Sequence, residues 1–251
     1  MATLETTDDA VLGGRLKLLQ PAKGHRAGHD AILLAAAAPS SVHAIDLGAG
    51  VGTAGLALLT RKATERTTLV EIDPALAALA RENAERNGFK DRSEIVCTDA
   101  LKLGRKGGTT HPAISSADLV LINPPFNDPA RKNVSPDPSR RRAHTANDAD
   151  LDQWVSAADR LLAPNGRLVL IHRPEAVDAI LATLRGRFGA AELIPIFPRD
   201  NVPAIRLIVR AIKSRRTPPV LLPGLVLNDA DNQPTAATNA ILREAGPLAP
   251  A

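Results

Sequence analysis

The sequence is poor in cysteine and in aromatic residues. Its 251 residues include one cysteine, Cys97, one tryptophan, Trp154, four phenylalanines and no tyrosine. A single cysteine excludes an internal disulfide and is typical of proteins from a reducing cytosol, so we expect a cytoplasmic protein. The scarcity of aromatic side chains argues against a nonspecific single-strand binder, which holds bases on rows of stacking rings.

Long apolar runs are also missing. The longest candidate, AILLAAAA at residues 31–38, lies between Asp30 and Pro39, whereas a membrane-spanning helix needs roughly 18 apolar residues or more. The N-terminal stretch MATLETTDDA is acidic and polar, unlike a secretory signal. We therefore expect no membrane segment.

Basic residues gather in three segments of the chain, 14–29, 131–142 and 199–216. The formal net charge is +4 and the sequence pI is about 9.6. Charge clusters of this kind are most often solvated faces, but they would also suit an anionic partner such as a nucleic acid.

Short apolar runs alternate with helical patterns over most of the chain. The predicted strands are 42–48, 67–73, 93–100, 117–123, 167–172, 190–197 and 204–213, and the predicted helices are 26–39, 51–62, 74–88, 151–163 and 174–188. The alternation predicts an α/β fold with a seven-stranded, mostly parallel sheet and helices on both faces. Only PRDNVP joins the last two strands, which is too short for a parallel crossover, so one strand should be antiparallel.

The chain is expected to divide into three parts. Residues 1–12 should form a flexible N-terminus, residues 13–216 the single large domain, and the proline-rich residues 217–251 a C-terminal extension with one short helix within 235–246. In the first predicted helix, Asp30 is a reasonable N-cap and Pro39 a stop.

A glycine-rich turn, IDLGAGVGTAG at 45–55, follows the first predicted strand. Glycines such as Gly48 and Gly50 permit a tight turn and the close approach of a ligand to the backbone. Alone, the pattern is that of an ordinary strand-to-helix turn. Asp46, at the strand end, would repel the pyrophosphate of a dinucleotide and attract an amine. The turn therefore argues against a nicotinamide dehydrogenase.

Two further acids follow the next two strands, Glu71 in VEID and Asp99 in CTDA. A carboxylate at the position of Glu71 can accept hydrogen bonds from both hydroxyls of a ribose, and Asp99 can accept from an adenine amino group. Because these strands end at one edge of a parallel sheet, the three acids would line one crevice. An adenosine with an amino-acid tail and no phosphate fits them, and S-adenosylmethionine is such a ligand.

The fourth strand ends at the same edge in NPPF, residues 123–126. The nitrogen of a planar amino group is a poor nucleophile because its lone pair is delocalised. Two acceptors, the side-chain oxygen of Asn123 and the carbonyl of Pro124, would hold its two N–H protons and turn the lone pair outward. The prolines fix the direction of that carbonyl, and Phe126 offers a face for a planar substrate. Positioning and electrostatics would carry the catalysis, with no metal.

With these motifs in this order, the chain resembles the Rossmann-like class I methyltransferases that use S-adenosylmethionine to methylate amino groups. Over residues 13–245 it resembles, more narrowly, the bacterial tRNA adenine-N6 methyltransferases, which modify an adenine beside the anticodon of a valine tRNA. The segments that carry the narrower resemblance are KGHRAGHDAILLAAAA, NPPFNDP, PDPSRRRAHT, LDQWVSAADRLLAPNGRLVLIHRPE and PAIRLIVRAIKSRR.

The resemblance implies roles for particular residues. Cofactor contacts fall to Asp46, Gly48, Gly50, Glu71 and Asp99, and catalytic roles to Asn123, the Pro124 carbonyl and Phe126. Phe126 stands where tyrosine is commoner, and stacking does not need the hydroxyl. The stretch KGHRAGHDA departs from the family pattern at His25 and His29.

The basic loop after NPPF suits an RNA partner, and the resemblance implies that this partner is the anticodon stem-loop of a tRNA. Its cations, Arg131, Lys132, Arg140, Arg141 and Arg142, follow the catalytic motif and would bind phosphates around a flipped adenine. The motif is shared with DNA-adenine and protein-glutamine methyltransferases, so methylation of a glutamine amide or of another nucleic acid is the main alternative. A non-catalytic RNA-binding protein is a weaker one, since it need not keep NPPF.

Overall fold

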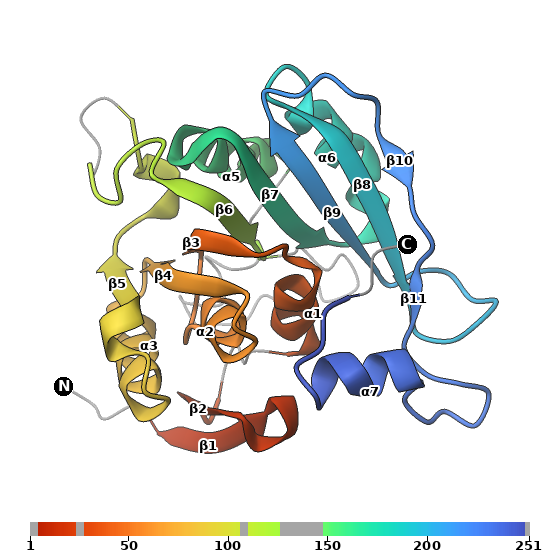
Figure 1. The fold of residues 1–251 in the computed structure, drawn as a ribbon, viewed down its shortest axis with the longest axis horizontal. Coiled ribbons are helices and arrows are strands. Elements are labelled where there is room, and N and C mark those ends of the chain that lie inside the picture. Colours follow the sequence, from red (N-terminus) through yellow and green to blue (C-terminus); the bar gives the residue numbers. More distant parts are fainter. Residues whose placement is uncertain (1–4, 24–27, 106–109, 126–147, 249–251) are drawn as a thin grey trace.

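The computed structural model describes residues 5–23, 28–105, 110–125 and 148–248, with backbone only for 148–150 (Figure 1). The strands are β1 Thr6–Val11, β2 Leu16–Pro21, β3 Ser41–Leu47, β4 Thr64–Glu71, β5 Ser93–Cys97, β6 Ala117–Ile122, β7 Leu162–His172, β8 Phe188–Phe197, β9 Arg206–Lys213, β10 Val220–Leu221 and β11 Leu225–Val226. The α-helices are α1 His29–Ala37, α2 Thr53–Thr60, α3 Pro74–Arg86, α5 Asp148–Leu161, α6 Val177–Leu184 and α7 Ala236–Leu242, with short 3-10 turns η1 Leu12–Gly14, η2 Lys90–Arg92, η3 Ala100–Lys102 and η4 Pro174–Ala176.

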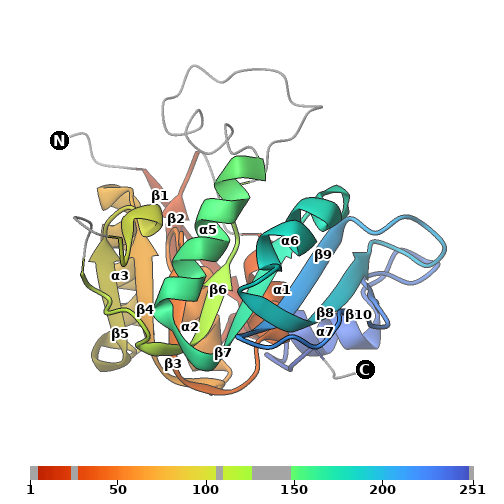
Figure 2. The same cartoon turned by 90° about the horizontal axis from the view of Figure 1, so that it is seen from above.

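The central sheet has the strand order β10-β8-β9-β7-β6-β3-β4-β5, with β11 also paired to β8 (Figure 2). The seven predicted strands are all present as β3–β9. The prediction that the last two of them are antiparallel is confirmed, because β9 runs antiparallel to β8 and also to β7. The predicted total of seven strands is wrong, because the described sheet has nine. The two additions, β10 and β11, are two residues each and are too short to show a periodic pattern.

Helices cover both faces of this sheet, as the sequence predicts (Figure 1). Successive side chains on a strand point to opposite faces, so each buried strand contributes to two cores. On β7, Val169 packs in the core that includes residues of α1 and α2, whereas Leu168 packs in the core that includes residues of α5 and α6. The strands are therefore apolar on both faces, which is usual for a parallel sheet.

The N-terminus differs from the expected flexible segment. Residues 6–11 form β1, which pairs antiparallel with β2. Two asparagines of α3 hold this hairpin in place. Asn83 exchanges hydrogen bonds with the N–H and the carbonyl of Leu19, at 2.7 and 3.0 Å, and Asn87 does the same with Lys17. The hairpin is thus attached through contacts that lie more than sixty residues away in sequence.

Residues of the expected C-terminal extension pack against the main sheet. The side chains of Ile241 and Leu248 are buried in the same core as α1, and the N–H of Leu248 donates to the carbonyl of Ala36 at 2.8 Å. The guanidinium of Arg61 donates to the carbonyls of Ala35 and Ala245. Helix α7 confirms the short helix expected within 235–246, while the division of the chain into domains stays a prediction.

Candidate active site at the carboxyl edge of the sheet

The ends of β3, β4, β5 and β6 bring the motif residues to one edge of the sheet. Leu47 pairs with Val70 of β4 on one side and with Ile122 of β6 on the other. Each of these strands runs parallel to its neighbour, so the residues that follow them emerge together. Gly48 therefore lies between Glu71 and Asn123 at the edge where ligands of open α/β sheets bind.

The glycine-rich turn is fixed by hydrogen bonds to β4. The N–H groups of Gly48 and Ala49 both donate to the carbonyl of Val70 at 2.9 Å. Three glycines of the turn, Gly48, Gly50 and Gly52, have positive φ angles of +73°, +58° and +90°. Residues other than glycine rarely adopt such angles. Nothing lies within 4 Å of the position that a Cβ of Gly50 would occupy. The turn therefore leaves open space beside a bare backbone.

Glu71 connects this turn to the start of α3. Its side chain is 8% exposed. One carboxylate oxygen accepts from the N–H of Gly50 at 2.8 Å, and the other accepts from the N–H of Asp73 at 2.8 Å. Since each carboxylate oxygen has a second lone-pair site, Glu71 can still accept two further hydrogen bonds. This is the pattern needed to hold a pair of vicinal hydroxyls.

Asp46 lies under the turn and is 3% exposed. Its Oδ2 accepts from the N–H of Gly55, in the first turn of α2, at 2.9 Å. Burial raises the pKa of Asp46 to about 7, the hydrogen bond from Gly55 lowers it, and the charge of Glu71 raises it further. A buried carboxylate that lacks a positive partner among the described residues would be stabilised by a cationic ligand group.

The remaining acid, Asp99, caps the short turn η3. Its Oδ1 accepts from the N–H of Leu101 at 3.0 Å, and its side chain is 28% exposed. Ile72, between the acids of VEID, exposes 53% of its surface although it is a large apolar residue. An apolar side chain at the rim beside Glu71 gives a flat ring a surface to pack on. No sequence pattern marks Ile72 as a site residue, because its exposure depends on the end of β4 at Glu71.

Asn123 and Pro124 follow β6 at the same edge. Asn123 is half-buried and Pro124 is buried. Within the described residues, no hydrogen-bond partner engages the Asn123 side-chain amide, so its oxygen is available to a substrate. Phe126, Arg131, Lys132, Arg140, Arg141 and Arg142 lie outside the described residues, and their assigned roles stay predictions.

Three of the six cations of the basic segment 199–216 form ion pairs within the protein. Arg206 pairs with Asp30 at 2.8 Å, Arg210 with Glu192 at 2.6 Å and Lys213 with Asp159 at 3.6 Å. The expectation that Asp30 caps α1 is wrong. Gly28 is the N-cap residue, and the Asp30 carboxylate is turned toward Arg206.

Two residues that the sequence analysis did not assign also shape the site. The ring of Trp154, on α5, lies 3.0 Å from the position that a Cβ of Gly48 would occupy. A Cβ on Gly55 would lie 2.3 Å from Cδ2 of Leu69 and 3.4 Å from Oδ2 of Asp46. Gly55 thus lets α2 approach β4 closely. The sequence could have indicated Gly55, because it belongs to the motif IDLGAGVGTAG. It could not have indicated Trp154, whose position depends on how α5 packs against the sheet.

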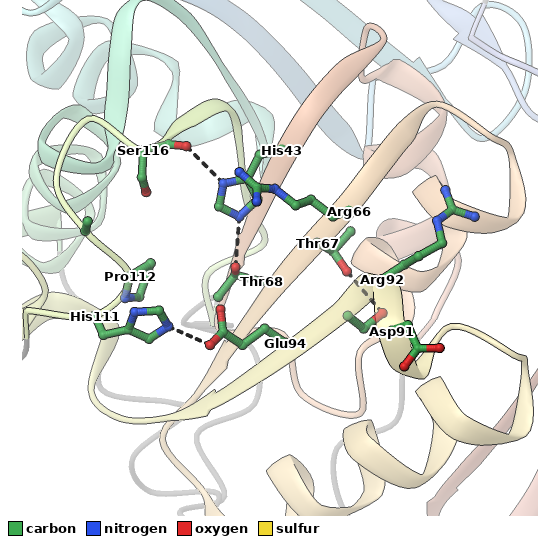
Figure 3. Close-up of a pocket in the computed structure, with 12 residues that line it drawn as sticks. His43, Arg66, Thr67, Thr68, Asp91, Arg92, Glu94, His111, Pro112 and Ser116 are labelled. Carbon is green, nitrogen blue, oxygen red and sulfur yellow. Dashed lines mark hydrogen bonds and ion pairs between the residues drawn. The ribbon is translucent and has the colours of Figure 1, made fainter.

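A polar groove of about 320 Å³ lies at the opposite, amino-terminal edge of the sheet (Figure 3). His43 points across its floor, with Nδ1 at 2.9 Å from the Ser116 carbonyl and Nε2 at 2.9 Å from the Thr68 hydroxyl. On the rim, Nε2 of His111 lies 2.7 Å from a carboxylate oxygen of Glu94. The groove is separate from the glycine turn, because it opens where the strands begin.

The described residues contain neither a membrane-spanning helix nor a metal-binding cluster. Among these residues, no helix is long and apolar enough to cross a membrane. In the same ranges, no three histidine, cysteine or acidic side chains are grouped so that they could hold a metal ion.

Comparisons with known proteins agree with this geometry. The chain is 26% identical to a tRNA1(Val) (adenine(37)-N6)-methyltransferase of Bacteroides fragilis over 188 residues, 73% of this chain and 76% of that protein. It is 34% identical to a protein of the same name from Porphyromonas gingivalis over 152 residues, 58% of each chain. The crystal structure of a predicted O-methyltransferase from Agrobacterium tumefaciens superposes with a TM-score of 0.71 and 25% identity, covering 87% of this chain and 97% of that one. A family model described as the methyltransferase small domain matches residues 27–195, and the chain therefore belongs to the methyltransferase small domain family.

Proposed function

We propose that the protein is an S-adenosylmethionine-dependent enzyme that methylates the N6 amine of an adenine in tRNA, next to the anticodon. The observation that carries the proposal is the position of Asn123. Its amide oxygen has no partner among the described residues and stands beside a glycine turn flanked by two buried carboxylates. The names of the Bacteroides and Porphyromonas relatives support adenine as the target.

The residues at the turn fit the cofactor. Glu71 is held by two backbone N–H groups and keeps acceptor capacity for ribose hydroxyls. Asp46 is a buried acid next to bare glycine backbone, where the ammonium group of an amino-acid tail would favour its charged form. Asp99, two residues after β5, would accept a hydrogen bond from an adenine amino group. When bound, the cofactor supplies a methyl group on a positively charged sulfur, which needs no metal to activate it.

The residues after β6 would act on the nucleophile. A target amine that donates one proton to the Asn123 oxygen and one to the Pro124 carbonyl is oriented with its lone pair toward the cofactor. As the N–C bond would form, the bond between the methyl carbon and the cofactor sulfur would break, leaving its electron pair on the sulfur. The nitrogen would become positive, and both hydrogen bonds would strengthen. The two acceptors therefore favour the transition state over the ground state. The extra proton leaves for solvent after transfer.

Substitution of Asn123 tests this proposal. We expect Asn123→Ala to lower the rate of methyl transfer by about 100-fold or more, while cofactor affinity stays near wild type. Asn123→Asp keeps an acceptor oxygen and should retain part of the rate. The assay is mass spectrometry of nucleosides from tRNA that was incubated with enzyme and cofactor, with N6-methyladenosine as the product.

The main alternative is methylation of a glutamine amide in a protein, because Asn123 could orient an amide nitrogen in the same way. RNase treatment of a cell lysate separates the two. Loss of methyl acceptance after RNase supports tRNA as the substrate, and unchanged acceptance supports a protein. A wild-type enzyme that transfers no labelled methyl group to either would contradict catalysis altogether.

A further inference from the structure

We propose that Arg173 binds a phosphate of the RNA substrate on the side of Asn123 that faces away from the cofactor. The inference rests on the proposed function, since it names a new contact for the same substrate. Arg173 directly follows β7, the strand that pairs with β6. None of the roles assigned above includes it.

The sheet register places Arg173 beyond Asn123. Ile122 pairs with Leu170, so Asn123 lies level with Ile171, and Arg173 lies two residues further out. At roughly 3.3 Å per residue, Arg173 therefore stands about 7 Å farther out along the strand direction, one strand spacing of about 4.8 Å to the side. A base held at Asn123 has its sugar and phosphate on this outer side.

The opposite neighbour of β7 contributes a second guanidinium. His172 pairs with Leu207 in the antiparallel ladder, and the next position places Arg173 opposite Arg206. Side chains alternate along both strands, so these two arginines share the face on which Ile171 and Ile208 pack with α1. The first turn of that helix carries Asp30.

The charges of this cluster do not balance. Among the described residues, the Asp30 carboxylate approaches this cluster and binds Nε of Arg206 at 2.8 Å. Among the described residues, no acid pairs with Arg173, and its Nε is buried without a hydrogen-bond partner. A buried N–H donor without a partner costs free energy that a bound acceptor would recover. The guanidinium of Arg173, with no acid paired to it among the described residues and with an unsatisfied Nε donor, defines a site for an anion.

Two anions could occupy this site, the phosphodiester of RNA and the carboxylate of the cofactor. The strand order favours RNA. The acids assigned to the cofactor lie on or directly beyond β3, β4 and β5, whereas Arg173 follows β7 and Arg206 begins β9, with β6 between the two sets. The planar guanidinium fork matches two phosphate oxygens, and such contacts position a nucleic acid without reading its sequence.

The test replaces Arg173 by glutamine, with Arg167→Gln as the matched control. Arg167 is an exposed residue in the middle of β7. Both variants therefore lose one positive charge, but only Arg173→Gln changes the carboxyl edge of the sheet. For Arg173→Gln we expect about tenfold weaker binding of tRNA and a salt slope of the logarithmic affinity lower by about 1. Cofactor affinity by calorimetry should be unchanged. Arg167→Gln should leave all three quantities at wild-type values.

Each other outcome has a definite meaning. Equal loss of tRNA affinity in the two variants, or none in either, refutes the site. Loss of cofactor affinity with unchanged tRNA affinity assigns Arg173 to the cofactor carboxylate and also refutes it. A wild type that binds no tRNA contradicts the proposed function itself. Should the glutamine variant fail to fold, Arg173→Lys keeps the charge but loses the fork, and we expect it to bind tRNA with intermediate affinity.

Discussion

The buried acid Asp46 should make the protein less stable as the pH rises from about 4 to about 7. Its pKa is raised from 3.8 to about 7, mainly by burial. Over this window the folded chain holds a proton that the unfolded chain has lost, so the free energy of unfolding falls with increasing pH. A difference of about 3 pKa units corresponds to about 4 kcal/mol, as an upper bound.

Asp46→Asn removes this charge and keeps an oxygen to accept from the N–H of Gly55. The variant should therefore unfold at nearly the same urea concentration as wild type near pH 4. Its advantage should grow to as much as about 4 kcal/mol near pH 8. The same change should weaken cofactor binding, because a neutral amide attracts an ammonium group less than a carboxylate does.

Urea unfolding followed by far-UV circular dichroism, repeated across this pH range, measures the difference. Asp91→Asn is a suitable control because Asp91 is exposed, and this substitution should produce no comparable gain at alkaline pH. A stability difference between Asp46→Asn and wild type that is constant with pH would refute the reasoning. So would a variant that is less stable than wild type near pH 8.

Two further substitutions test the packing around the glycine turn. Gly55→Ala places a Cβ 2.3 Å from Leu69, so α2 must shift, and we expect a loss of about 1–3 kcal/mol in unfolding free energy together with weaker cofactor binding in calorimetry. If this variant binds cofactor and unfolds like wild type, the close approach of α2 to β4 is not needed. Asn83→Ala leaves the Leu19 N–H and the Val51 carbonyl without their partner, and we expect a loss of about 2–4 kcal/mol. An unchanged melting temperature would mean that the hairpin is not held by this side chain.

The strands of the main sheet were predictable because their signals are local. Each of β3–β9 contains a short apolar run of the length that strands prefer, although β7 begins at Leu162, five residues before the predicted strand. The PRDNVP connection was enough to predict the reversed direction of β9. The glycine turn and the acids at the ends of β3 and β4 were also predictable, because such residues are recognised by their position at a strand end.

The parts that were missed depend on contacts between distant residues. The strand β1 contains Asp8 and Asp9, which have low β-propensity. It pairs with β2, and β2 is held by asparagines of α3. The basic segment 199–216 was interpreted as a solvated face that would also suit an anionic partner. Arg206 is paired with Asp30, 176 positions earlier, and a count of charges in a segment cannot show such a partner.

The side-chain amide of Asn83 makes the folding of the β1–β2 hairpin depend on α3. Its nitrogen donates to the carbonyls of both Leu19 and Val51, so one side chain joins the hairpin to the glycine turn. A two-stranded hairpin alone is marginally stable in water, and α3 is synthesised some sixty residues after it. During synthesis the hairpin therefore cannot fold stably until α3 has also been made. Until then, the growing chain contains the glycine turn but lacks the hydrogen bond from Asn83 to the Val51 carbonyl in that turn.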